Sequence, residues 1–475
     1  MKGEAHRSLL WSAIQQFATF GIQFILGIIL ARLLNPYDYG LIAMQGVFFA
    51  ISNAFVDFGF EGALIQKKAC NRADLNTAFL FSLSMAVVLY ILLFYAAPLV
   101  ADFYNAPILG KMLRISAFVL VFNAMGIAPK ALLQRQLRFK ELALATTGIS
   151  LFSGGVALGM AYHGYAYWSL IAQSLLSAAL LTMICALYAH WAPSWLFSME
   201  SFRHLITFGL PMLFTSLVHA IYSNIYTLVV GRFYSAQELG LYSKAEGYSY
   251  YVPFNLCGFS MRALYPLLSR VQDDSALLRE SAMRILHTSL FIVLPINVFL
   301  LFKSEDIIRV VLTDKWVEMA PLMQVMCISS MAFVVSNLHF NLFKAIGKTQ
   351  ILFICELIKK ILGIIVLFVT YRYGLMVMAW GILVYSYINV VIGSWFVWRF
   401  INITFMDQIK QVHIVLFNGV VALVACYLVG MLIEQLHIRL VLSFFVFFCI
   451  YVLLGVLVKD KAIDFFKGYL QRKDG

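Results

Sequence analysis

Residues 351–370 read ILFICELIKKILGIIVLFVT, an apolar run that contains three charged side chains. A run of about 20 apolar residues is the length that a membrane-spanning helix needs. The charges are Glu356, Lys359 and Lys360, and each costs at least roughly 2.5 kcal/mol on insertion scales at such a depth. Because charges inside the bilayer mark a function by default, the run predicts a membrane helix that handles an anion.

The whole chain has the composition of a polytopic membrane protein. Of its 475 residues, 62% are hydrophobic and 12% are charged, whereas soluble proteins carry about 25% charged residues. The mean hydropathy is +0.86. The segment before the first apolar run is only eight residues long and is charged. The apolar run after it is long enough for a full span, so we expect no cleaved signal peptide. The fold class predicted is therefore an all-α membrane protein.

Fourteen candidate spans can be marked along the chain. The number is even, so both termini should lie on one side. With Lys and Arg residues at the ends of spans counted in the adjoining connector, that side has 23 and the other side has 9, which places both termini in the cytoplasm. The spans are residues 9–31, 40–60, 75–97, 113–133, 142–162, 166–189, 205–230, 240–262, 285–302, 320–343, 351–370, 375–397, 412–433 and 438–458.

Several partners are not expected from the composition. The net charge of +12 is concentrated at helix ends, which is not the pattern of a nucleic-acid-binding surface. The seven cysteines lie mostly in apolar runs without the spacing of metal ligands, and we interpret them as small buried hydrophobes. We predict no metal site, no cofactor and no nucleic-acid partner.

A weak internal repeat relates the two halves of the chain. Residues 31–41 (ARLLNPYDYGL) align without gaps, at an offset of 200, with residues 231–241 (GRFYSAQELGL). Each copy joins the first and second span of a set of six. Six is an even number, so the two sets are expected to be related by a pseudo-twofold axis along the membrane normal. The predicted parts are residues 1–203 (first lobe), 204–411 (second lobe) and 412–475 (an appended helix pair with a basic cytoplasmic tail).

Three short motifs resemble those of polysaccharide flippases: residues 31–41, residues 263–270 (ALYPLLSR) and residues 313–317 (TDKWV). These flippases form the polysaccharide transporter branch of the multidrug/oligosaccharidyl-lipid/polysaccharide exporter superfamily, which includes Wzx-type and colanic-acid-type exporters. The resemblance implies two six-helix lobes in a V-shaped arrangement. It also implies a substrate of oligosaccharide joined through pyrophosphate to a polyprenyl lipid, moved from the inner to the outer leaflet.

The lipid II flippase of the same superfamily has an appended helix pair after twelve core helices, which this chain matches. The chain departs from that relative because its first two spans carry no dense arginine cluster for the anionic headgroup. The sugar composition of the substrate is therefore left open.

The candidate headgroup site consists of Lys359, Lys360 and Lys244. In a cleft of low dielectric, these ammonium groups would attract a pyrophosphate. One alternative is that Glu356 and Lys360 form an ion pair four residues apart and neutralise each other. Another is that the lysines extend to the cytoplasmic face, with their charged ends in water. For Lys244 and Glu246 the alternative is an ion pair near the outer surface.

Other charged residues suggest coupling to an ion or gating. Glu356, Asp57 and Glu246 are candidate carboxylates for coupling to H⁺ or Na⁺, although Asp57 also fits a helix-end residue that meets water. Arg32 and Arg232 end their spans at the predicted outer face and are candidate gate residues. Capping of the helix C-terminus would explain both arginines equally well.

The predicted function is that of a non-enzymatic flippase in the bacterial inner membrane, working by alternating access. Its partners would be a lipid-linked oligosaccharide, membrane lipids and H⁺ or Na⁺, with no prediction of oligomeric state. A drug/cation antiporter of the same superfamily is the first alternative, but it would need acidic cavity residues. A glycan polymerase or ligase is the second, but the outer connectors, the longest near residues 303–319, are too short for a catalytic domain.

Overall fold

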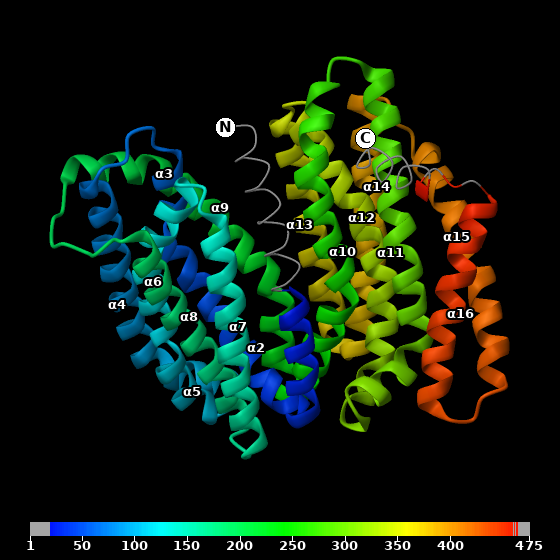
Figure 1. The fold of residues 1–475 in the computed structure, drawn as a ribbon, viewed down its shortest axis with the longest axis horizontal. Helices are drawn as coiled ribbons and strands as arrows, with labels where there is room; N and C mark the ends of the chain where they lie inside the picture. Colours follow the sequence, from blue (N-terminus) through cyan, green and yellow to red (C-terminus); the bar gives the residue numbers. More distant parts are fainter. Residues whose placement is uncertain (1–19, 459, 461, 464–475) are drawn as a thin grey trace. The chain divides into compact units, whose positions relative to one another are not determined.

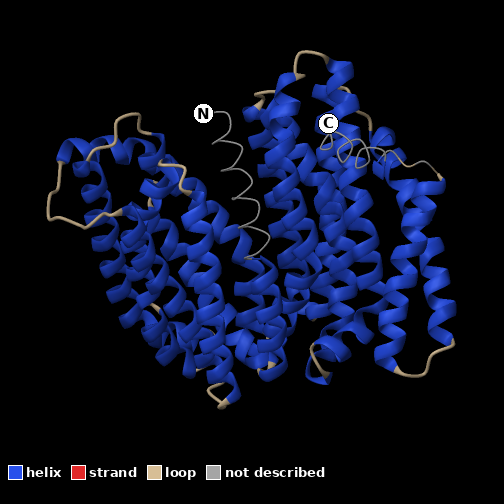
Figure 2. Ribbon diagram, viewed as in Figure 1, coloured by secondary structure: helices blue, strands red, loops and turns tan. Residues whose placement is uncertain are grey.

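The computed structural model describes residues 20–458, 460, 462 and 463, without the side chains of residues 259–267. These residues form helices and no β-strand (Figures 1 and 2). Eleven helices in the described part of the chain are long and apolar enough to cross a membrane. The chain is thus an all-helical, multi-pass membrane protein, as predicted. Residues 9–19 of the first predicted span and most of the basic tail lie outside the described residues.

Three predicted spans are not among these eleven helices. The described part of the first span, Phe20–Leu33, is short. Helices α10 (Ala236–Arg270) and α13 (Thr349–Thr370) carry charged residues within apolar sequence. The number of fourteen spans therefore stays a prediction.

The chain divides into two compact units, Met1–Gly240 and Leu241–Gly475. Helix α9 belongs to the first unit by its contacts, although the repeat would place it at the start of the second lobe. The three-part division at residues 203 and 411 stays a prediction. In order, the other helices of the first unit are α2 (Pro36–Asp57), α3 (Phe60–Gln66), α4 (Arg72–Phe103), α5 (Ile108–Ser116), α6 (Phe118–Arg135), α7 (Phe139–Tyr162) and α8 (Tyr167–Ala189), followed by α9 (Met199–Phe233).

A sharp turn at the end of the second predicted span separates α2 from α3. Phe58 and Gly59 both have positive φ, 49° and 72°. A Cβ added at Gly59 would lie 2.5 Å from Cβ of Met212 on α9, so only glycine fits this close approach. The rings of Phe58 and Phe60 pack 5.4 Å apart in the core beside the turn. The turn keeps the residues that precede and follow it, Asp57 and Glu61, close together.

The second unit is built around α11 (Ser275–Val311) and α12 (Ala320–Ala345). In each of them 67% of the most apolar window is buried inside the protein, against 17% in α14, so these two helices form the centre. The last two helices, α15 (Phe405–Met431) and α16 (Leu436–Leu457), pack against each other and against α11 (Figure 1). The remaining elements are η1 (Asp314–Met319), η2 (Tyr371–Tyr373), α14 (Leu375–Ile401), α15 (Phe405–Met431) and α16 (Leu436–Leu457).

The two copies of the repeat begin their second helices with the same local structure. At the start of α2, the backbone N–H of Asn35 donates to Oδ2 of Asp38 at 3.0 Å. At the start of α10, the N–H of Ser235 donates to Oε2 of Glu238 at 2.9 Å. In both copies an acidic residue three positions on satisfies a free N–H at the helix start.

The same two helix starts cross each other at a pair of glycines in the first unit. A Cβ added at Gly40 would lie 1.7 Å from the carbonyl oxygen of Ala236. A Cβ added at Gly240 would lie 1.8 Å from the carbonyl oxygen of Pro36. The two contacts are reciprocal, with each glycine meeting the first turn of the other helix. The repeat found in the sequence thus corresponds to a symmetric backbone crossing.

Candidate functional site

The first unit contains a cavity of about 570 Å³. It is lined by α2, α3, α6, α8 and α9, whose lining residues extend in the sequence from Ala50 to Asn224. Ten of the nineteen lining residues are polar or charged, whereas small-molecule sites are mostly apolar. The polar lining residues are Asn53, Asp57, Glu61, Asn123, Lys130, Thr182, Ser216, His219, Ser223 and Asn224.

One wall of the cavity is a polar stripe on α2 and α3. Asn53 and Asp57 are four residues apart, which puts them on one face of α2, and the turn brings Glu61 at the start of α3 beside Asp57. The amide N–H of Glu61 donates to Oδ1 of Asp57 at 3.3 Å across the turn. The stripe therefore presents one neutral amide and two carboxylates to the same space.

The facing wall on α6 matches this stripe group by group. Asn123 Nδ2 donates to Oδ1 of Asn53 at 2.9 Å. Lys130 Nζ lies 3.0 Å from Oε1 of Glu61, and Gln134 Nε2 donates to the same oxygen at 2.9 Å. Glu61 is thus fully engaged, while Asp57 lies within electrostatic reach of both Glu61 and Lys130. With all three groups ionised, two carboxylates and one ammonium give this end of the cavity a formal net charge of −1.

Of this group, the sequence analysis identified only Asp57. Asn53, Glu61, Asn123 and Lys130 were missed because their meeting depends on the packing of α2 and α3 against α6. The four-residue spacing of the α2–α3 stripe was the signal that could have identified it.

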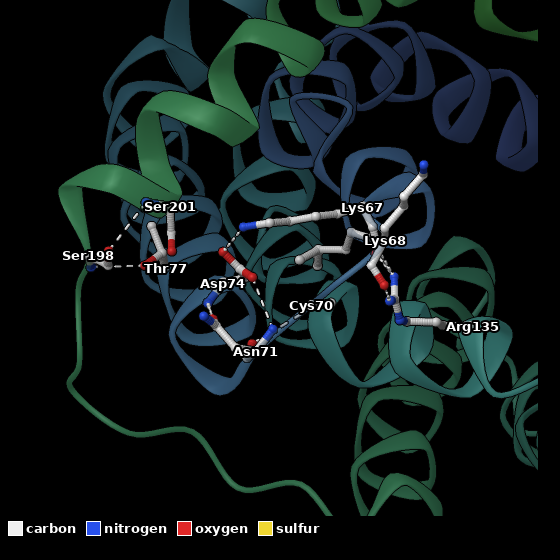
Figure 3. Close-up of polar contacts among 10 residues, drawn as sticks. Lys67, Lys68, Cys70, Asn71, Asp74, Thr77, Arg135, Ser198 and Ser201 are labelled. Carbon is white, nitrogen blue, oxygen red and sulfur yellow. Dashed lines mark hydrogen bonds and ion pairs between the residues drawn. The ribbon is translucent and has the colours of Figure 1, made fainter.

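Beyond the charged end of the cavity, a polar cluster ties α3, α4, α6 and α9 together (Figure 3). Lys67 Nζ donates to Oδ1 of buried Asp74 at 2.6 Å, and the N–H of Asn71 donates to Asp74 Oδ2 at 3.0 Å. Arg135, the last residue of α6, donates to the carbonyl oxygens of Leu64, Ile65, Lys67 and Lys68. A guanidinium that binds the last carbonyls of α3 holds that helix against α6.

In the second unit, Lys359 lies inside the protein and not on its surface. It belongs to the packed face of α13, together with Cys355, Gly363 and Leu367. Lys359 Nζ lies 3.1 Å from Oε1 of Glu356, and the two side chains are 6% and 32% exposed. The alternative weighed from the sequence paired Glu356 with Lys360; the structure pairs it with Lys359, because the packed face of α13 passes through Lys359. Lys360 is half-buried.

A buried polar network lies on one side of this ion pair and begins at His339. His339 on α12 lies within electrostatic reach of Lys359. Its Nε2 is 2.8 Å from Oε1 of Gln408, which also accepts a hydrogen bond from Oγ of Ser394 at 3.0 Å. His339 thus connects the surroundings of Lys359 to Gln408 on α15 and Ser394 on α14.

The remaining predicted residues are in plainer surroundings. Lys244 Nζ lies 5.6 Å from the ring centroid of Tyr248, one turn further along α10, in a cation–π contact. Glu246 is exposed. Arg32 is exposed, and Arg232 Nη1 donates at 2.6 Å to the carbonyl oxygen of Phe103, the last residue of α4. Among the described residues singled out from the sequence, Glu356 and Lys359 are therefore in direct contact.

Comparison with known proteins agrees with this architecture. The family described as polysaccharide biosynthesis protein matches residues 29–321. Lipopolysaccharide biosynthesis protein WzxC of Escherichia coli is 24% identical over 360 residues, covering 74% of this chain and 72% of WzxC. Succinoglycan biosynthesis transport protein ExoT of Rhizobium meliloti is 23% identical, covering 75% of this chain and 72% of ExoT.

Among solved structures, the lipid II flippase MurJ in an inward closed conformation has a similar fold. Its TM-score is 0.76 at 16% sequence identity, over 95% of this chain and 99% of MurJ. The resemblance inferred from the sequence motifs is confirmed. Because the family match covers more than half of the sequence, this chain belongs to the polysaccharide biosynthesis protein family.

Proposed function

We propose that this protein is a flippase that moves a polyprenyl-pyrophosphate-linked oligosaccharide across the membrane for surface polysaccharide synthesis. The observation that carries the proposal is the family match to a chain made almost wholly of membrane helices. One relative of similar length is named a transport protein. The chemistry that such a family needs inside the bilayer is translocation of its lipid-linked intermediates.

In this proposal the protein is a transporter and not an enzyme. Its connectors are short, so a polymerase or ligase would have little room outside the membrane for handling an acceptor sugar. We place the protein in the bacterial inner membrane with both termini in the cytoplasm, following the distribution of Lys and Arg.

In the proposed mechanism, Lys359, Lys360 and Lys244 attract the pyrophosphate. Glu356 neutralises Lys359 in the resting state, so the two adjacent lysines with this carboxylate carry a net charge of +1. An anion that approaches Lys360 would compete with Glu356 for Lys359. The lipid tail stays in the hydrocarbon while alternating access turns the headgroup from the inner to the outer leaflet.

An ion gradient drives the proposed cycle through one of three carboxylates, Asp57, Glu246 or Glu356. Asp57 is the strongest of them, because it lines a polar cavity while the neighbouring Glu61 is already engaged by Lys130 and Gln134. Arg32 and Arg232 are the proposed gate residues at the outer ends of their helices.

A drug/cation antiporter is the second candidate function. The net charge of −1 at one end of the first-unit cavity favours it, since a cationic substrate prefers an acidic site. The flippase and the antiporter can be distinguished by their substrates, a lipid-linked oligosaccharide for the flippase and a cation for the antiporter.

The test is transport by the purified protein in liposomes. A polyprenyl pyrophosphate that carries a short oligosaccharide is placed in one leaflet, and its arrival in the other is measured with a sugar-modifying enzyme. We expect transport, and we expect its loss in Lys359→Ala/Lys360→Ala protein that still folds. Absence of transport by the wild-type protein, with transport of lipophilic cations instead, would establish the antiporter.

A further inference from the structure

The neutral part of the first-unit cavity lies beyond the charged group of Asp57, Glu61 and Lys130. Along α2, Asn53 is one turn from Asp57, and along α6, Asn123 is two turns from Lys130. Thr182 on α8 and Asn224 on α9 line the same cavity. We propose that this neutral part, defined by Asn53, Asn123, Thr182 and Asn224, is a saccharide subsite that binds sugar units of the transported lipid. This inference rests on the proposed function and assigns part of its substrate to a place in the fold.

The size of the cavity favours a saccharide over a coupling ion alone. A water molecule takes a share of about 30 Å³ of liquid, so about 570 Å³ equals roughly 19 waters. An ion with a few ligands needs only a small part of that space. The volume falls within the range of about 300–1,000 Å³ of sites for small molecules.

The unused hydrogen-bonding capacity of the lining favours a ligand rich in hydroxyl groups. Asn123 uses one N–H for Asn53, and Asn224 Nδ2 donates to the carbonyl oxygen of Ala220 at 2.8 Å and to Oγ of Ser223 at 3.2 Å, which leaves its Oδ1 as acceptor. Each amide side chain has two donor hydrogens and an acceptor oxygen, so both keep groups that can bind a ligand. Thr182 Oγ1 donates at 2.7 Å to the carbonyl oxygen of Phe122, which leaves its acceptor lone pairs. Amides and hydroxyls of this kind can exchange donors and acceptors with sugar hydroxyls.

The remaining lining defines which sugars fit. Nine lining residues are not polar, among them Ala50, Ala54, Ile127 and Ala178, and the C–H faces of a sugar ring can pack against them. The adjoining end of the cavity has a net charge of −1. A uronic acid would therefore be repelled, whereas a neutral sugar or an amino sugar would not. The subsite is thus expected to select neutral or basic sugar units.

The test uses two probes that differ in the saccharide alone. One is a polyprenyl pyrophosphate that carries a single hexosamine; the other carries a neutral trisaccharide that begins with the same sugar. Transport of each is measured in liposomes containing the full-length protein. Asn123→Leu removes the amide, and Ala220→Phe fills the cavity from α9. Val218→Phe is the matched control, because Val218 is on the same helix, is 54% exposed and does not line the cavity.

We expect Asn123→Leu and Ala220→Phe to slow transport of the trisaccharide probe about tenfold, the effect of losing one or two ligand hydrogen bonds. Transport of the hexosamine probe should fall by less than about threefold, and Val218→Phe should change neither. A uronate-bearing trisaccharide should move more slowly than the neutral one in the wild-type protein.

Equal loss for both probes, in variants whose thermal unfolding is unchanged, would overturn the subsite, as would no loss for either. Faster movement of the uronate-bearing probe would also overturn it. Failure of the wild-type protein to move any lipid-linked sugar would instead contradict the proposed function.

Discussion

At the scale of single residues, the pair of Glu356 and Lys359 combines a structural cost with a proposed role. Lys359 is buried, so its ammonium depends on Glu356 and on the polar network near His339. Its depth in the membrane was predicted from the sequence. Its partner was not, because sequence spacing allows pairs three or four residues apart equally, and the packing of α13 decides between them.

We expect Glu356→Gln to lower the stability of the protein by about 1–2 kcal/mol. This is less than the roughly 3–5 kcal/mol for breaking a fully buried pair, because Glu356 keeps about a third of its side chain exposed. Lys359→Met should be near neutral for stability, and Glu356→Gln/Lys359→Met should recover the loss. Thermal unfolding in detergent measures all three variants. Equal melting temperatures for Glu356→Gln and the wild type would show that the pair contributes nothing to stability.

The carboxylate of Asp57 is the second prediction at this scale. We expect Asp57→Asn to remove the dependence of transport on an imposed H⁺ or Na⁺ gradient, because the amide can neither release a proton nor balance a cation. Downhill exchange of substrate should continue. Glu246→Gln is the comparison, since Glu246 is a rival candidate for coupling that does not line the cavity. Retained gradient dependence in Asp57→Asn, with loss in Glu246→Gln, would transfer the coupling role to Glu246.

At the scale of helices, the crossing of α2 and α10 makes a sharp prediction. Gly40→Ala should destabilise the protein by about 1–3 kcal/mol or more, because the new methyl group would overlap the carbonyl oxygen of Ala236. Gly240→Ala should behave alike against Pro36. Gly46→Ala on α2 is the matched control, since nothing lies within 4 Å of its added Cβ. That control should be neutral or stabilising by up to about 1 kcal/mol through helix propensity. Similar thermal unfolding of Gly40→Ala and Gly46→Ala would contradict the close crossing.

The ranges of the helices were predicted from the sequence more accurately than the contacts between helices. Apolar length identifies a span wherever charges are few, which is why α7, α8 and α16 coincide closely with predicted ranges. The end of the second span was predicted close to the turn at Phe58 and Gly59, but the short helix α3 after it was missed, because it depends on packing against α6 and α9. The first-unit cavity was missed for the same reason: four of its walls come from helices far apart in the chain. The pattern of polar and apolar residues in a sequence indicates which face of a helix is buried, but not which other helix packs against that face.

At the scale of the whole molecule, the internal repeat concerns the contact between two helices, and the distribution of Lys and Arg concerns the orientation of the chain in the membrane. The repeat was visible in a few identities, and its glycines form a reciprocal crossing because a close backbone contact tolerates no side chain. The transmembrane orientation rests on the uneven distribution of Lys and Arg. It predicts that the connector between α3 and α4 is cytoplasmic, and that the connector between α7 and α8 is on the opposite side.

Cys70, in the connector between α3 and α4, is a native probe of this orientation. We expect a membrane-impermeant maleimide to label it in inside-out vesicles and not in right-side-out ones. Five of the other six cysteines are buried, and Cys449 lies within α16. Burial, together with the nearby Asp74 carboxylate, raises the pKa of the Cys70 thiol. Because the thiolate is the reactive form, labelling should be slow at pH 7 and should rise roughly tenfold per pH unit.

Tyr165→Cys, in the exposed connector between α7 and α8, should label from the opposite side in Cys70→Ser protein. Labelling of both positions from the same side would overturn the predicted topology, and with it the direction of the proposed transport.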